Sequence, residues 1–189
     1  MRKYAIILLT ALFFTGCAMT PNHGKVAAVD IQSAGKYNRS GNEYFSKGQY
    51  VLAIDEYKNA IKMFPRYAKA HSNLGYAYFK KNQYDRAIVE FSRAIECDPQ
   101  YARAYNNRGL VYFAKGEYDN AIHDYNKSIE IDPALAKPYD NRGTIYMLTG
   151  DEDKACADFL RACDLGECGS FEFLQDNGIC NTEYLAMAL

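Results

Sequence analysis

Residues 68–101, AKAHSNLGYAYFKKNQYDRAIVEFSRAIECDPQY, decide the fold, because similar stretches lie directly before and after them. The glycine at the eighth position of this stretch recurs every 34 residues without an insertion, as Gly41, Gly75, Gly109 and Gly143. An alanine recurs at the same interval, as Ala53, Ala87, Ala121 and Ala155. A fixed period of this length indicates a repeat architecture, in which each unit packs mainly on its neighbours.

The period divides the middle of the chain into four units, which are residues 34–67, 68–101, 102–135 and 136–169. Within each unit, apolar and small residues recur three and four positions apart, which predicts two antiparallel helices. The break inside the units is expected at Gly48, Asn82, Gly116 and Gly150, and the ends of the first three units at Pro65, Pro99 and Pro133. Glu167 stands where the fourth proline is expected, so the last unit is degenerate. The predicted fold class is all-α, a solenoid of four helix-turn-helix units with a C-terminal capping helix.

The pattern of the units resembles the tetratricopeptide repeat. In the second unit the residues that carry the resemblance are His71, Leu74, Gly75, Tyr78, Ala87, Phe91, Ala94 and Pro99. Only His71 departs from the pattern, which has a large aromatic residue there. The resemblance implies a concave groove, lined by the first helix of each unit, in which a protein or an extended peptide binds.

Some polar residues recur without being needed for packing. The second position of successive units holds Lys69, Arg103 and Lys137, and the sixth holds Asn73, Asn107 and Asn141. Residues four apart lie on one face of a helix, so these side chains would form a ladder of cations and amides along the groove. Neighbouring positions supply a floor that includes Asn42, Phe45, Tyr76, Phe79, Leu110 and Phe113. The alternative is that the ladder consists of ordinary solvated helix residues.

Chaperone-binding members of this family grip the C-terminal carboxylate of a ligand with a five-residue clamp. Asn42, Asn73 and Arg103 match three of its positions, the last as arginine for lysine. Asn38 and Asn107 stand where the clamp has cations. The resemblance therefore implies a protein or peptide partner that is acidic or C-terminal, with a weakened clamp.

The N-terminus, MRKYAIILLTALFFTGC, has a short basic start and then an apolar run, as export signals do. Its end resembles the lipobox of bacterial lipoproteins, with Phe14 in place of the usual leucine. This resemblance implies a signal peptide at residues 1–16, acylation of Cys17, and a lipid anchor in the outer membrane facing the periplasm. Residues 17–33, which include Pro21 and Gly24, are predicted to be a tether. An ordinary secretory signal with an incidental cysteine is the alternative.

Four of the six cysteines gather near the C-terminus, as Cys156, Cys163, Cys168 and Cys180. Export permits disulfides, and four cysteines allow three pairings. The gaps are wider than the close cysteine pairs typical of zinc sites, so no metal is expected. Cys97 is predicted to be a buried free thiol, with an intermolecular disulfide as the alternative.

The geometry of the last segment, residues 170–189, narrows the pairing. Ser170 is a good N-cap and Asn177-Gly178 a good helix stop, so a short capping helix is expected to run back along the last repeat helix. A hairpin of this kind predicts the nested disulfides Cys156–Cys180 and Cys163–Cys168. We expect Phe171, Phe173 and Leu174 to cover the open end of the fourth unit.

Composition and motifs limit the function. The chain has 22 lysines and arginines against 23 aspartates and glutamates, which does not indicate a nucleic-acid partner. His71 and His123 are expected to be structural or solvated, and no catalytic constellation, phosphate loop or cofactor motif is present in the sequence. The expected function is a non-enzymatic scaffold that binds another protein. An envelope assembly chaperone or pilotin-like factor is one alternative, and an enzyme resembling Sel1-like cysteine-rich repeat proteins is another.

Overall fold

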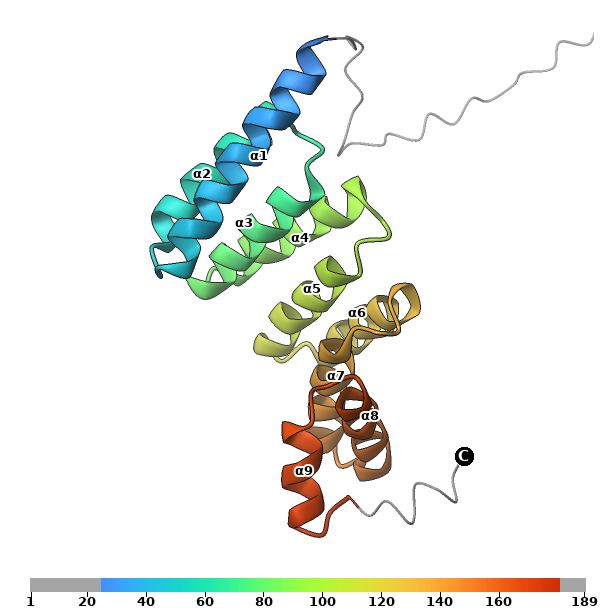
Figure 1. Cartoon of the computed structure of the whole chain (residues 1–189). Coiled ribbons are helices and arrows are strands. Elements are labelled where there is room, and N and C mark those ends of the chain that lie inside the picture. Colours follow the sequence, from blue (N-terminus) through green and yellow to red (C-terminus); the bar gives the residue numbers. More distant parts are fainter. Residues whose placement is uncertain (1–24, 181–189) are drawn as a thin grey trace, which may run out of the picture.

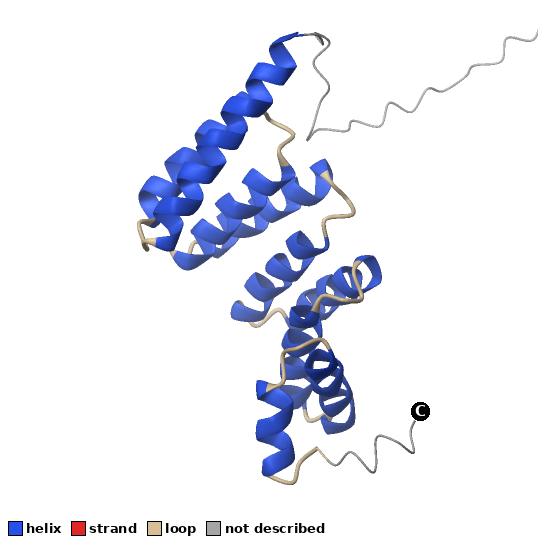
Figure 2. Ribbon diagram, in the orientation of Figure 1, coloured by secondary structure: helices blue, strands red, loops and turns tan. Residues whose placement is uncertain are grey.

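The computed structural model describes residues 25–180, and this part of the chain holds nine α-helices and no strand (Figures 1 and 2). The helices are α1 (Lys25–Ser46), α2 (Tyr50–Met63), α3 (Ala68–Lys80), α4 (Tyr84–Cys97), α5 (Ala102–Ala114), α6 (Tyr118–Ile131), α7 (Ala136–Thr149), α8 (Glu152–Asp164) and α9 (Gly169–Asp176). The predicted all-α solenoid is confirmed. Helices α3, α5 and α7 begin at the first residues of the units deduced from the period.

The helices stack as consecutive pairs. The two helices of each unit pack together, and each second helix packs on the first helix of the next unit. The odd-numbered helices also contact one another in the order α1, α3, α5 and α7. One face of the stack is therefore built from the first helix of every unit, as Figure 1 shows.

The repeated glycines allow the two helices of a unit to approach closely. A Cβ atom on Gly41 would lie 2.5 Å from Cε1 of Tyr57, and one on Gly109 would lie 2.7 Å from Cε1 of Tyr125. Both rings are buried, with 2% and 0% of their surface exposed. A larger residue at either glycine would overpack this contact, at a cost of about 1 to 3 kcal/mol.

The turn inside the second unit differs from the others in its residue. Asn82 has a φ of 57°, and the equivalent Gly116 has a φ of 77°. Both lie in the left-handed region, which asparagine tolerates better than other residues with a side chain. This explains why the expected helix break occurs at Asn82 without a glycine.

The first helix is longer than expected. Helix α1 begins at Lys25, so residues 25–33, predicted to be part of the tether, are helical instead. Pro21 and Gly24 precede this segment, and the segment itself contains no proline or glycine that would stop a helix.

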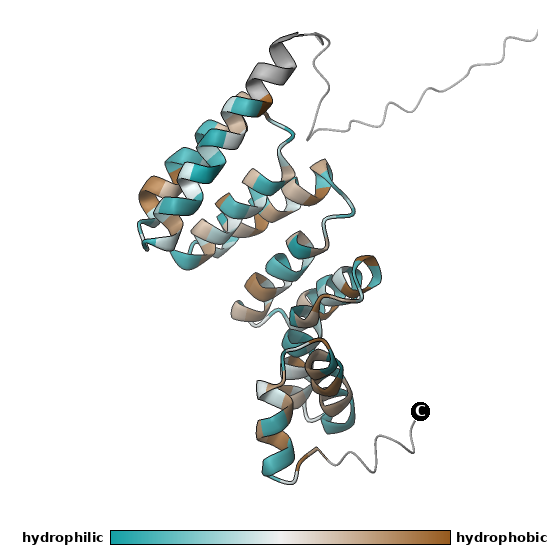
Figure 3. Ribbon diagram, in the orientation of Figure 1, coloured by the Kyte–Doolittle hydropathy of each residue, from teal (hydrophilic) through white to brown (hydrophobic). Residues whose placement is uncertain are grey.

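The predicted signal peptide and Cys17 lie outside the described residues. Within the described residues, hydrophobic and hydrophilic residues alternate along the helices (Figure 3), and none of these helices is long and apolar enough to cross a membrane.

The C-terminal cap packs through one side of α9. Phe171 and Leu174, three residues apart, are buried against α8, with 5% and 8% of their surface exposed. The expectation that Phe173 also covers the fourth unit is wrong, because it lies on the other side of α9 and is 65% exposed. Ser170 is not the N-cap either: α9 begins at Gly169, and the Ser170 hydroxyl donates to Oδ1 of Asp140 on α7 at 2.6 Å.

Two disulfides tie this cap to α8. Cys156 is bonded to Cys180 and Cys163 to Cys168, the pairings expected from the hairpin, with Cα atoms 5.4 and 3.9 Å apart. Cys97 is half-buried, and no cysteine in the described part of the chain is a free thiol, which corrects the expectation for Cys97.

Candidate functional site

The residues predicted to recognise a ligand all lie on odd-numbered helices. Asn42 is on α1, Lys69, Asn73 and Tyr76 are on α3, Arg103 and Asn107 are on α5, and Lys137 and Asn141 are on α7. These helices contact one another along one face of the stack (Figure 1), and all eight residues are exposed or partly exposed. Their environments along that surface are nevertheless unequal.

Three asparagines form a hydrogen-bonded cluster between α1 and α3. The side-chain amide of Asn73 donates to Oδ1 of Asn38 at 2.9 Å and to Oδ1 of Asn42 at 3.1 Å. The Tyr57 hydroxyl also donates to Oδ1 of Asn42, at 2.9 Å. Among the described residues, Oδ1 of Asn73 and the NH₂ group of Asn42 have no partner. This pair of one acceptor and one donor matches the needs of a peptide group in an extended ligand.

A similar amide link joins the third and fourth units. Asn141 donates to Oδ1 of Asn106 at 3.1 Å, and Asn106 donates to Oδ1 of Asn107 at 3.2 Å. In both links the sixth residue of one unit donates to the fifth residue of the unit before it. The second unit has Ser72 at its fifth position, so no such link forms between the second and third units. The NH₂ group of Asn107 is left without a partner in the described part of the chain.

The three predicted cations also differ. Lys137 pairs with Glu167, with 2.9 Å between Nζ and Oε2. Lys69 and Arg103 are exposed, and the described residues include no acidic partner for either of them. The sequence did not distinguish Lys137, because Glu167 reaches it only after the chain turns into the cap. Of the three predicted cations, those without an acidic partner are therefore Lys69 in the second unit and Arg103 in the third.

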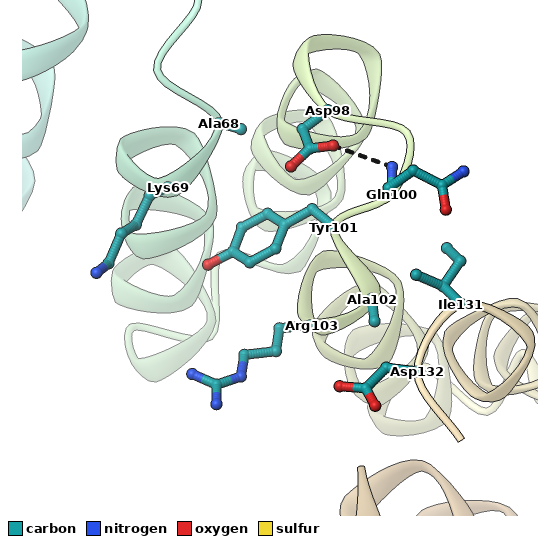
Figure 4. A pocket seen from close by; sticks show the side chains of 9 residues that line it. All are labelled: Ala68, Lys69, Asp98, Gln100, Tyr101, Ala102, Arg103, Ile131 and Asp132. Atoms are coloured by element: carbon teal, nitrogen blue, oxygen red, sulfur yellow. Dashed lines mark hydrogen bonds between the residues drawn. The ribbon is translucent and has the colours of Figure 1, made fainter. Parts of the chain in front are cut away.

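Lys69 and Arg103 border a cleft of about 530 Å³ between these two units. The cleft is lined by Ala68, Lys69, Asp98, Gln100, Tyr101, Ala102, Arg103, Ile131 and Asp132 (Figure 4). In Figure 4 the Tyr101 ring lies between the Lys69 and Arg103 side chains, and its hydroxyl points to the same side as their charged groups. Tyr101 was not among the residues selected from the sequence, although it occupies the last position of the second unit, beside the ladder.

Aromatic side chains continue the surface toward the other end of the odd helices. The rings of Phe45 and Tyr76 stack across α1 and α3 with centroids 5.4 Å apart, and Tyr76 contacts Phe79 at 6.0 Å. All three are half-buried. A partly exposed aromatic strip offers apolar contact area for a ligand at little entropic cost.

Two ion pairs that sequence reasoning missed each join the two helices of one unit, and their arginines also bond to the preceding unit. Arg108 makes a bidentate contact with Asp124, at 2.7 and 2.8 Å, and also donates to Oγ of Ser92 in the preceding unit at 2.9 Å. Burial alone would lower the pKa of Arg108, but the hydrogen bond and charge of Asp124 raise it above its ordinary value. The signal was an arginine at the seventh position of a unit with an aspartate sixteen residues later.

The same pattern recurs one period on. Arg142 contacts Asp158 at 2.7 Å through two nitrogens and also donates to Asn126 of the preceding unit. The hydrogen bond to Asp158 outweighs burial and raises the pKa of Arg142. Both arginines therefore stabilise the stack and are not free to bind a ligand.

His71 is structural as well. Its Nδ1 lies 2.8 Å from Oε2 of Glu90, and its Nε2 lies 3.0 Å from the carbonyl oxygen of Pro65. The ring is 5% exposed, so it joins α3 to α4 and to the loop before α3. The described residues contain no group of His, Cys, Asp or Glu side chains arranged to hold a metal ion.

Comparison with known families agrees with this architecture. A profile described as "TPR repeat" matches residues 41–82 and 75–116, and profiles described as "Tetratricopeptide repeat" match residues 102–135 and 136–165. The matches together run from residue 41 to residue 165. The chain belongs to the tetratricopeptide repeat family.

Solved structures of similar proteins extend the comparison. A crystal structure of MamA is 33% identical, with a TM-score of 0.65, over 76% of this chain and 84% of that one. The first tetratricopeptide repeat domain of Spaghetti (RPAP3), bound to the HSP90 peptide SRMEEVD, is 27% identical, with a TM-score of 0.61, over 64% of this chain and 95% of that one. A thermophilic TPR protein of Thermus thermophilus is 23% identical, with a TM-score of 0.65, over 71% of this chain and 75% of that one, and it shows the shared fold. None of the curated proteins matches this chain.

Proposed function

We propose that this tetratricopeptide repeat protein is a non-enzymatic scaffold that binds an extended segment of another protein on its concave face. The observation that carries the proposal is the set of unsatisfied polar groups on α1, α3 and α5. They include the free acceptor of Asn73, the free donor of Asn42, and the unpaired cations Lys69 and Arg103. The peptide complex of the RPAP3 domain supports this use of the fold.

The proposal includes a location. The lipobox-like end of the leader supports cleavage before Cys17 and acylation of its thiol and amine, which would anchor the protein in the outer membrane with the repeats in the periplasm. Several acyl chains hold a protein on a membrane far longer than one chain does. Nucleic acid is not part of the proposed function, and the membrane is contacted through the anchor.

Site-specific photocrosslinking in intact cells tests the binding face. A photoreactive residue at Tyr76 is placed on the concave face, and a matched control at Lys58 is placed on the exposed side of α2. We expect a defined protein to be captured from Tyr76 and not from Lys58. Capture of the same proteins from both positions would contradict the proposed groove.

The timing of capture separates a standing scaffold from an assembly chaperone or pilotin-like factor. A scaffold partner should be captured at all stages of growth, whereas a chaperone client should be captured only while it is newly made. For the anchor, Cys17→Ser is expected to abolish acylation and release the protein from membranes. Retention of the unacylated variant on membranes would refute this part of the proposal.

A further inference from the structure

The cleft between the second and third units has a chemistry that the rest of the groove lacks. It is the boundary where the cations at the second position, Lys69 and Arg103, have no acidic partner in the described part of the chain, and where the amide of Asn107 is not used in a link between units. At the next boundary, Lys137 is neutralised by Glu167 and Asn141 is bonded to Asn106. Of the repeated ladder, therefore, the cations that can still bind an acidic group of a ligand lie at this cleft.

The donors at this point face one side of the cleft (Figure 4). The Tyr101 hydroxyl and the charged groups of Lys69 and Arg103 face the same side in Figure 4, and Tyr101 makes no side-chain hydrogen bond within the described residues. The acidic residues of the cleft, Asp98 and Asp132, lie at the C-terminal ends of α4 and α6. Each of them accepts a backbone N–H, from Gln100 at 3.0 Å and from Ala134 at 3.2 Å, and neither forms an ion pair with Lys69 or Arg103.

We propose that Lys69, Tyr101 and Arg103 form a subsite for an internal glutamate or aspartate side chain of the bound segment. This inference rests on the proposed peptide-binding function and names the chemistry of the ligand. A carboxylate has four lone-pair directions, and an arginine, a lysine and a hydroxyl can satisfy them together. Two unpaired cations on one edge of a cleft complement such a group, and its charge would guide the ligand into register.

An internal carboxylate fits this surface better than the C-terminus of a chain. Recognition of a chain terminus in this family would require cations at residues 38 and 107. Asn38 is 3% exposed and its oxygen is used by Asn73, and Asn107 carries no charge. Asn73 lies one turn beyond Lys69 on α3, about 6 Å along the helix, where its free acceptor can bind the backbone of a chain that continues past the cleft.

The test uses fluorescein-labelled SRMEEVD as a probe, because this peptide carries two internal glutamates as well as a C-terminal carboxylate. Fluorescence anisotropy on the full protein compares the free acid, the C-terminal amide, and the amide of SRMQQVN, which has no side-chain carboxylate. We expect amidation to change Kd less than roughly twofold and the loss of the side-chain carboxylates to weaken binding roughly tenfold or more. A large loss on amidation, equal binding of the peptide without carboxylates, or no binding of any peptide overturns the subsite.

Protein variants locate the effect. Lys69→Gln combined with Arg103→Gln should weaken binding of the amidated probe roughly tenfold or more, and Tyr101→Phe roughly fivefold. The matched control Lys58→Gln with Lys62→Gln removes the same charge from α2 and should leave Kd unchanged. If the control pair weakens binding equally, the effect is one of net charge and the subsite is refuted.

One further variant separates the subsite from the function on which it rests. If Tyr76→Ala weakens probe binding while the Lys69 and Arg103 changes do not, the groove binds peptides without this subsite. The crosslinking from Tyr76 described above tests the proposed function without any acidic probe, so the two proposals fail on different results.

Discussion

The hydroxyl of Tyr125 is the most informative single group for testing the packing argument. Tyr57 and Tyr125 occupy the same position two units apart, and both rings are buried. The Tyr57 hydroxyl donates to Asn42, but the position equivalent to Asn42 in the third unit is Leu110. The Tyr125 hydroxyl consequently has no hydrogen-bond partner among the described residues, and burial, assisted by the charge of Asp124, raises its pKa above the ordinary value.

Tyr125→Phe should therefore stabilise the protein. A buried hydroxyl without a partner costs about 1 to 3 kcal/mol, and removing the oxygen sacrifices some van der Waals contact, so we expect a net gain of about 1 kcal/mol. Phe91 and Phe159 already fill the equivalent position in the second and fourth units. The same change at Tyr57 removes a hydrogen bond and should cost about 1 kcal/mol.

Urea denaturation of the full chain with its disulfides intact measures the free energy of unfolding of both variants. The two changes should shift it in opposite directions, so the variants should differ by about 2 kcal/mol. In thermal unfolding, a gain of about 1 kcal/mol corresponds to a rise in Tm of about 2 to 4 °C. Leu110→Asn offers a second measurement, because it supplies the acceptor that Tyr57 has. Its effect should be more favourable in the parent protein than in the Tyr125→Phe variant by about 1 kcal/mol. The reasoning is refuted if Tyr125→Phe destabilises the protein as much as Tyr57→Phe does.

The described geometry leads to three other predictions. Burial raises the pKa of Tyr57 to about 12, above its unfolded value of about 10, so its contribution to stability is complete below about pH 10 and is lost as pH rises toward 12. Urea unfolding across that range should show this loss, and Tyr57→Phe should reduce it; an unchanged slope would contradict the assignment. Asn82→Gly should stabilise the protein by about 0.5 kcal/mol by relieving a left-handed residue, whereas Gly116→Ala should cost about 1 kcal/mol, as measured by urea midpoints. Replacing Cys156 and Cys180 with serine removes a cross-link between residues 24 apart and should lower the free energy of unfolding by about 3 kcal/mol. Amide exchange should become faster only in α8 and α9. Uniform loss of protection along the whole stack would argue against a local cap.

Much of the fold could be predicted because the same pattern of residues occurs in all four units. Gly41 and Tyr57, or Gly109 and Tyr125, are sixteen residues apart within one unit, so the period alone shows that they belong to one helix pair. The elements outside the period were predicted less well. The start of α1 at Lys25 and the side of α9 on which Phe173 lies are both outside the repeat, so no repeated register fixes them.

The candidate site shows the same division. The sequence placed Lys69, Arg103 and Lys137 on equivalent positions, and they do lie on equivalent helices. It could not show that Lys137 is neutralised by Glu167, because that contact depends on where the cap turns. Nor could it show that Asn73 and Asn141 are bonded to the preceding unit while Asn107 is not, since that depends on which side chain stands across the boundary.

The sequence by itself determined the period, the helix pairs, the packing glycines and the face that carries the polar ladder, because each follows from residue spacing within a helix or from a neighbour at a fixed interval. Only the tertiary structure decided which members of the ladder remain available. A hydrogen bond between units uses the donor group of Asn73, and an ion pair with the turn before the cap uses the charge of Lys137, whereas Lys69, Tyr101 and Arg103 remain around one cleft in the stretch 68–103. Availability depends on contacts between residues distant in the sequence, and those form only when the helices pack.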